Sequence, residues 1–67
     1  MQRYNIVEDF QAGKVRVLVL DRDFEPMGRN CCLYIEGKRY ECQLNSIRNW
    51  ITVISENEFA GKIAEFR

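Results

Sequence analysis

Apolar residues recur at every second position through long parts of this 67-residue chain. The clearest example is the segment VRVLVL at residues 15–20, where valines alternate with one arginine and two leucines. Successive side chains of a β-strand point to opposite faces of a sheet, and β-branched residues are enriched in strands. The alternation therefore predicts a protein made of short strands rather than helices.

Four further segments have the character of strands. Residues 3–7 and 50–54 are predicted as single strands, and residues 31–36 and 39–44 alternate on either side of a glycine and a lysine, as in a β-hairpin. Residues 21–30 combine the only proline with glycine, asparagine and two aspartates, which is typical of a loop.

The hairpin allows two registers. A two-residue turn at Gly37-Lys38 suits a type II′ turn, which prefers glycine first, and it places Ile35 opposite Tyr40. A turn at Glu36-Gly37 would instead place Ile35 opposite Lys38. We favour the first register because it pairs apolar side chains with each other across the two strands.

Residues 56–66 also allow two interpretations. Ser55 and Glu58 match the S-x-x-E capping box of a helix, and apolar residues follow at helical spacing. Against a helix, Gly61 would lie inside it, at a cost of about 1 kcal/mol relative to alanine. A closing strand at residues 62–66 would cover an open edge of the sheet, and we favour this strand over a short C-terminal helix.

Together these segments predict a single all-β domain over residues 1–67, with five or six short strands in an antiparallel barrel or roll. The expected architecture is similar to that of SH3-like and elongation-factor-type barrels, but no motif accompanies this likeness and it implies no function. The residues expected to fill the interior are Val15, Val17, Val19, Leu33, Ile35, Tyr40, Cys42, Leu44, Ile51 and Val53.

Three cysteines are the candidate chemical groups of the chain. An odd number cannot form a complete set of internal disulfides, and the chain has no histidine and no C-x₂-C pair that would indicate a zinc site. The alternation places Cys31 and Cys42 on the inner face as small apolar groups. We therefore expect no metal and no cofactor.

The remaining composition argues against several classes of function. Without histidine the chain lacks the commonest general acid-base group, and its four glycines lie singly rather than in a phosphate-binding loop. A domain this small has little room for the ~300 Å³ pocket that a small-molecule substrate needs. The longest apolar run has four residues, far short of the ~20 of a membrane helix. We expect a cytoplasmic protein without a secretory signal that is not an enzyme.

The outer faces of the predicted strands carry more large apolar side chains than a solvated surface needs. These are Leu18, Leu20, Tyr34, Trp50 and Ile54. In one interpretation, the tail and the N-terminal segment fold over them as a second small core. In the other, they form a protein interface, most simply that of a symmetric homodimer, with Arg39 and Arg48 as contacts at its rim.

Single-stranded RNA or DNA is the alternative partner. Between residues 29 and 50 four basic residues stand against two acidic ones, and Tyr34 and Trp50 can act as stacking surfaces beside them. This local excess is small, and the whole chain has ten basic and ten acidic residues, whereas nucleic-acid-binding proteins usually carry net positive charge. The sequence therefore favours a protein-interaction module.

Overall fold

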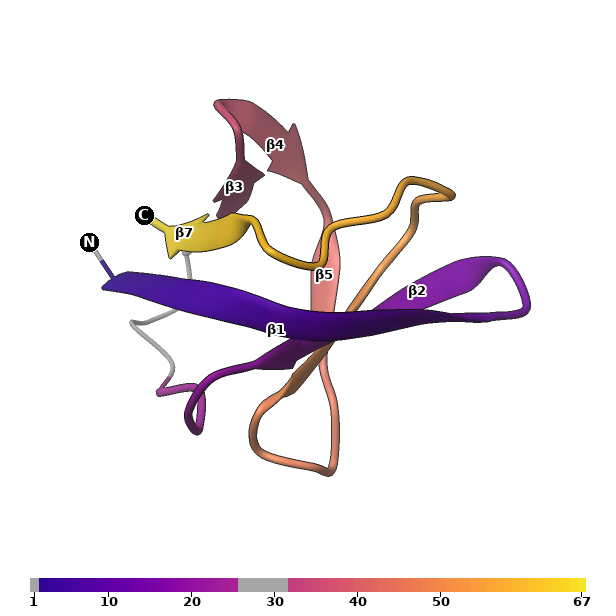
Figure 1. Cartoon of the computed structure of the whole chain (residues 1–67), viewed down its shortest axis with the longest axis horizontal. Helices are drawn as coiled ribbons and strands as arrows, with labels where there is room; N and C mark the ends of the chain where they lie inside the picture. Colours follow the sequence, from indigo (N-terminus) through magenta and orange to yellow (C-terminus); the bar gives the residue numbers. More distant parts are fainter. Residues whose placement is uncertain (1, 26–31) are drawn as a thin grey trace.

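Seven antiparallel strands form one sheet in the computed structural model, which describes residues 2–25 and 32–67 (Figure 1). The strands are β1 (Gln2–Ala12), β2 (Val15–Leu20), β3 (Leu33–Ile35), β4 (Lys38–Tyr40), β5 (Cys42–Leu44), β6 (Trp50–Val53) and β7 (Ile63–Phe66). Their order across the sheet is β4-β3-β7-β1-β2-β6-β5, and the described residues contain no helix. The all-β prediction is confirmed, with seven strands in place of the five or six expected.

The two edge strands, β4 and β5, are consecutive in the chain and separated only by Glu41. The sheet therefore curls until its edges meet at that residue, but the described strands form no pairing ladder between β4 and β5. A closed barrel is thus not confirmed. The single strand predicted over residues 39–44 is divided because β4 pairs with β3 whereas β5 turns away to pair with β6.

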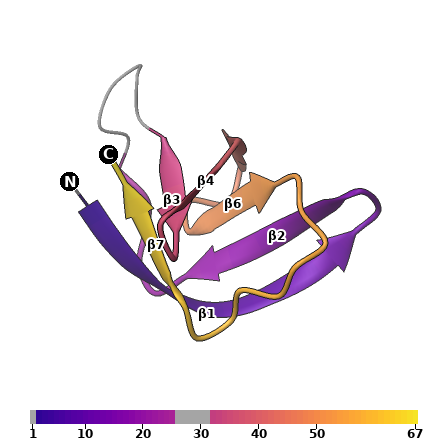
Figure 2. The same cartoon turned by 90° about the horizontal axis from the view of Figure 1, so that it is seen from above.

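The long strand β1 connects the two halves of the curled sheet (Figure 2). Its first residues pair with β7, and the stretch from Ile6 to Ala12 pairs with β2. The register shifts between Ile6 and Glu8, which marks a β-bulge. Residues three apart face opposite sides of a regular strand, so the bulge is what allows both Ile6 and Asp9 to face inward.

The core lies inside the curl, and every buried side chain in it is that of an apolar or aromatic residue. Four predicted interior residues are confirmed as fully buried: Leu33, Ile35, Ile51 and Val53. Tyr40 and Cys42 pack at the margin of this core, as their common face predicts. Leu44, which the same alternation places beside them, is instead 60% exposed.

The predicted faces of β2 are wrong. The structure buries Leu18 and Leu20, which are 0% and 1% exposed, and leaves Val15 and Val19 half-exposed on the outer face. Both faces of this strand are apolar, so a period of two does not distinguish them. The larger leucine side chains gain more from burial and fill the interior, where Leu18 lies beside Ile51 of β6.

The turn between β3 and β4 is formed by Glu36 and Gly37, whose φ angles are 53° and 80°. Ile35 pairs with Lys38, so the preferred turn at Gly37-Lys38 is wrong and the alternative register is correct. Positive φ at both positions is characteristic of a type I′ turn, whose twist matches that of the flanking strands. This match outweighs the cost of a left-handed conformation at a non-glycine residue.

The tail ends in strand β7 and contains no helix, which confirms the favoured interpretation. Ala64 and Phe66 are buried in the core, and β7 pairs with β1 on one side and β3 on the other. The residues of the capping box serve a turn instead, because the Asn57 N–H donates a hydrogen bond of 3.1 Å to the Ser55 hydroxyl.

Leu33→Ala tests the assignment of the core. Leu33 is 0% exposed, and truncating a buried leucine costs about 2–5 kcal/mol, which approaches the whole stability of a small domain. We expect this variant to be largely unfolded in urea titrations followed by circular dichroism. The control is Leu44→Ala, at a side chain that is 60% exposed, which should change the free energy of unfolding by less than about 0.5 kcal/mol. Equal losses in the two variants would contradict the inner-face assignment.

Candidate functional site

Two aromatic rings meet on the outer face of the half of the sheet formed by β1, β2 and β6. Phe10 extends from β1 and Trp50 from β6, with ring centroids 5.2 Å apart and ring planes at 74°. Because β1 and β6 flank β2, this contact passes over β2. Val17 of β2 is only 5% exposed although it lies outside the main core cluster. The ring pair is therefore an ordered surface feature that covers the strand beneath it.

We name this surface the outer aromatic patch, which comprises Phe10, Val15, Val17, Val19, Trp50 and Ile54. Cross-strand register places Phe10 beside Val17 and Trp50 beside Val19. Phe10 remains 37% exposed and Ile54 70% exposed. The exposed apolar side chains of the patch thus surround a covered valine, and Thr52 lies between Trp50 and Ile54 on the same face of β6.

The apolar residues that the sequence places outside do not form one surface. Trp50 and Ile54 belong to the outer aromatic patch. Leu18 and Leu20 are enclosed in the core, so they cannot contact a partner. Tyr34 lies on β3, and three strands separate it from β6 in the sheet. The patch gains an aromatic residue of β1 and the outward valines of β2, neither of which the sequence interpretation placed there.

The two predicted rim arginines lie on different elements. Arg39 is exposed on β4, where it pairs across the strands with Tyr34, and it also lines a cavity together with Ile54 of the patch. Arg48 is exposed in the loop before β6, and its carbonyl accepts a hydrogen bond of 2.8 Å from the Phe24 N–H. Arg39 therefore borders the patch, whereas Arg48 helps to fix the approach of the chain to Trp50.

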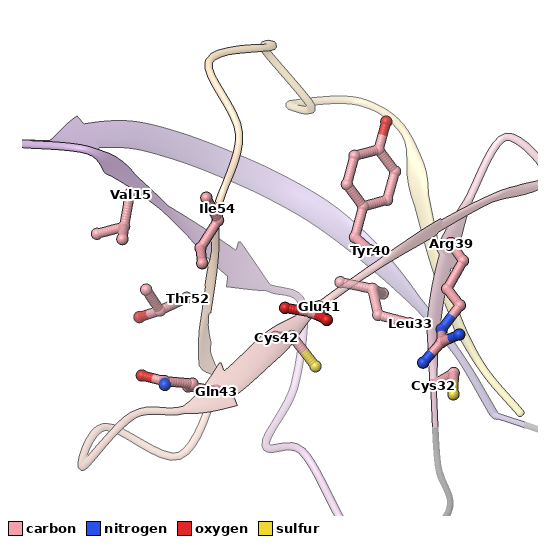
Figure 3. A pocket seen from close by; sticks show the side chains of 10 residues that line it. All are labelled: Val15, Cys32, Leu33, Arg39, Tyr40, Glu41, Cys42, Gln43, Thr52 and Ile54. Carbon is pink, nitrogen blue, oxygen red and sulfur yellow. The ribbon is translucent and has the colours of Figure 1, made fainter.

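The cavity beside the patch lies at the bend between β4 and β5 and has a volume of about 430 Å³ (Figure 3). Figure 3 shows Val15, Thr52 and Ile54 along one side of it and Leu33 and Arg39 toward the other. The sequence predicts little room for a pocket of this size, so the structure corrects that expectation. The space arises because the two edges of the sheet diverge from Glu41 instead of pairing.

The two cysteines that the structure describes lie near this bend. Cys32 and Cys42 both line the cavity and are half-buried, and Cys42 also packs against the core as its predicted face requires. Cys31 lies outside the described residues. Within residues 2–25 and 32–67, no three potential metal-ligating side chains gather at one place.

An almost buried ion pair joins Asp9 of β1 to Arg16 of β2 on the inner face of the sheet. Their side chains are 5% and 12% exposed, and Arg16 Nη2 lies 2.8 Å from Asp9 Oδ1. Asp9 Oδ2 accepts hydrogen bonds from the backbone N–H groups of Phe59 and Ala60. One carboxylate therefore fastens the loop between β6 and β7 to the sheet and positions the buried ring of Phe59.

The electrostatics of Asp9 agree with a structural role. Burial raises the pKa of this carboxyl, but the hydrogen bonds from Arg16 and from the two backbone N–H groups, with the Arg16 charge, lower it by more. The pKa therefore lies below its ordinary value of 3.8. Because the folded-state pKa is depressed, the carboxylate stabilises the fold above pH 3.8 and loses this contribution as the pH falls through the folded-state value.

Comparison with known proteins assigns no family to the chain, because no family model, curated protein or solved structure matches it. Within the part of the chain that the structure describes, no helix has the length and apolar character needed to cross a membrane. The surfaces described above are therefore the basis for any statement about function.

Asp9→Asn should destabilise the protein by about 3 kcal/mol or more, because it leaves the nearly buried Arg16 charge without its carboxylate. Urea unfolding at neutral pH measures this loss. Glu8→Gln removes a neighbouring carboxylate that is exposed, and it should change the free energy of unfolding by less than about 0.5 kcal/mol. If both variants lose the same stability, the loop is not held by Asp9.

Acid titration gives a second test of the same carboxylate. The wild type should lose stability as the pH falls below 3.8, because protonation of Asp9 then competes with the ion pair. Asp9→Asn has no proton to gain at this position, so its free energy of unfolding should fall less steeply over the same range. Parallel curves for the two proteins would contradict the lowered pKa.

Proposed function

We propose that the protein is a non-catalytic interaction module of the cytoplasm that forms a symmetric dimer through the outer aromatic patch. The contact between Phe10 and Trp50 over Val17 is the observation that carries this proposal. Ordered apolar surfaces of this kind mark protein interaction sites, and tryptophan is among the residues that most often supply binding energy. The rings are already held in place before a partner arrives, which lowers the entropy cost of binding.

A second copy of the chain is the partner that the charges favour. The formal net charge is zero, with ten basic and ten acidic residues, so two copies approach without mutual repulsion. Glu8 lies beside Val19 at the β1 side of the patch, and Arg39 borders the cavity on the other side. The patch is thus flanked by one acidic and one basic residue, so a second copy meets no single-sign charge at its border.

The cytoplasmic assignment rests on the cysteines. Secreted domains of this size usually pair their cysteines in disulfides, and an odd number does not permit complete pairing within one chain. The cysteine count therefore supports a reducing compartment.

Trp50→Ala tests the dimer. Removing a central aromatic anchor typically costs at least 2 kcal/mol of binding, so we expect dimerisation to weaken by about 30-fold. Light scattering over a range of protein concentrations should show the wild-type mass rising toward twice that of one chain. The variant should remain near the mass of one chain over the same range, and added salt should have little effect on either protein.

The matched control is Ile63→Ala, at a side chain that is 51% exposed on the outer part of β7 and outside the patch. It should dimerise as the wild type does. A wild type that stays monomeric at the highest concentration would refute self-association. If Trp50→Ala dimerises as well as the wild type, the interface lies elsewhere.

A further inference from the structure

A second outer surface crosses the half of the sheet that lacks the aromatic patch. Cross-strand register places Arg39 of β4, Tyr34 of β3, Glu65 of β7 and Arg3 of β1 side by side in one row. Arg67 follows Glu65 by two residues, and its guanidinium lies 4.0 Å above the centroid of the Tyr34 ring. We name these five residues the arginine row.

The arginine row contains three guanidinium groups and one carboxylate. Glu65 Oε2 lies 3.1 Å from Arg3 Nε, and its Oε1 lies 2.8 Å from Arg67 Nε. These pairs use only the Nε atoms, and within residues 2–25 and 32–67 no ion pair takes up the terminal N–H groups of either arginine, whose side chains are 64% and 50% exposed. The described residues place no carboxylate within ion-pair distance of Arg39, which leaves a local excess of two positive charges.

The nearby charges do not cancel this excess. Glu36 follows Tyr34 by two residues, but its carboxylate is 2.6 Å from Lys62 Nζ and forms a separate pair. A surface cavity of about 270 Å³ is lined by Arg3, Tyr34, Glu36, Glu65 and Arg67. Arg39 lies outside this cavity, on the other side of Tyr34 in the row. Although the whole chain has zero net charge, strand pairing brings residues that are distant in the sequence together in one basic surface.

Planar groups add a second type of contact to this surface. The Arg67 guanidinium lies over the Tyr34 ring, and a guanidinium stacked in this position presents a flat outer face to solvent. Unpaired bases stack on aromatic rings and on guanidinium planes, whereas the side chains of an acidic peptide have no flat ring to place there. Phosphate binding by arginine together with a stacking surface favours a nucleic acid over an acidic peptide.

We propose that the arginine row binds single-stranded nucleic acid, with phosphates on Arg39, Arg3 and Arg67 and a base stacked on the Arg67–Tyr34 pair. Glu65 acts as an internal competitor, because its carboxylate occupies the arginine edges that a phosphate would use. Arg39 is the one residue of the row that also borders the outer aromatic patch, and the other four residues lie on the other half of the sheet. The row can therefore bind a strand whether or not the chain dimerises.

Fluorescence anisotropy with a labelled single-stranded oligouridine is the direct test. Each phosphate contact on a single strand contributes about −0.7 to the slope of log affinity against log salt concentration. Three contacts therefore predict a roughly 20-fold loss of affinity between about 50 mM and about 200 mM salt. Absence of binding at low salt, or binding that is insensitive to salt, would overturn the proposal.

Two variants should move the affinity in opposite directions. Arg39→Ala should weaken binding and make the salt slope shallower by about 0.7, since one phosphate contact is lost. Glu65→Gln should strengthen binding, because it frees two arginines from a negative charge while keeping the size of the side chain. The matched control is Glu58→Gln, at an exposed carboxylate outside the row. If binding is only a non-specific attraction to positive charge, the two variants should raise the affinity equally.

Three further controls test whether the bound strand lies on the arginine row. Lys14→Ala removes an exposed positive charge from the turn between β1 and β2 and should leave affinity unchanged. Trp50→Ala should also leave it unchanged, so failure of the dimer and failure of this site are distinguishable. Polyglutamate that competes as strongly as unlabelled oligouridine would identify an acidic polypeptide as the ligand and refute the nucleic-acid proposal.

Discussion

The Asp9 carboxylate is the constraint on which this small fold most depends. It reaches the inner face of the sheet only because a bulge in β1 changes the alternation between Ile6 and Glu8. There it binds Arg16 and the backbone of the loop that carries Phe59, so one end of the core is sealed by a charged group and an aromatic ring together. A chain of this length buries a limited apolar area, which gives one such attachment a large share of the total stability.

The same curled sheet presents two outer surfaces with different chemistry. The half formed by β1, β2 and β6 is apolar and carries the Phe10–Trp50 contact, whereas the half formed by β4, β3, β7 and the start of β1 is charged. Both halves share β1, so the relative position of the two surfaces is fixed by continuous strand pairing. The two surfaces therefore lie at a defined separation from each other, with no hinge between them.

Much of the fold follows from the sequence, and the errors have definite physical causes. Alternation identified the strands and placed Leu33, Ile35, Ile51 and Val53 inside because each of those strands has one clearly apolar face. It failed where the local pattern carries no information on the interior. The strand β2 is apolar on both faces, and the bulge in β1 interrupts the alternation between Ile6 and Glu8, so the strand predicted at residues 3–7 stops short of Phe10. The patch was therefore predicted only in part, through Trp50 and Ile54, and the arginine row was not predicted as a unit because it joins residues from opposite ends of the chain.

The single residue between β4 and β5 has a consequence for how the chain tolerates changes of length. Side chains keep alternating through Glu41, so Tyr40 and Cys42 both reach the core although their strands pair with different neighbours. One residue gained or lost at this joint would exchange inside for outside along all of β5, whereas a change of length in the loop at 45–49 leaves the alternation of both neighbouring strands intact. Natural insertions and deletions in this protein should therefore avoid the joint.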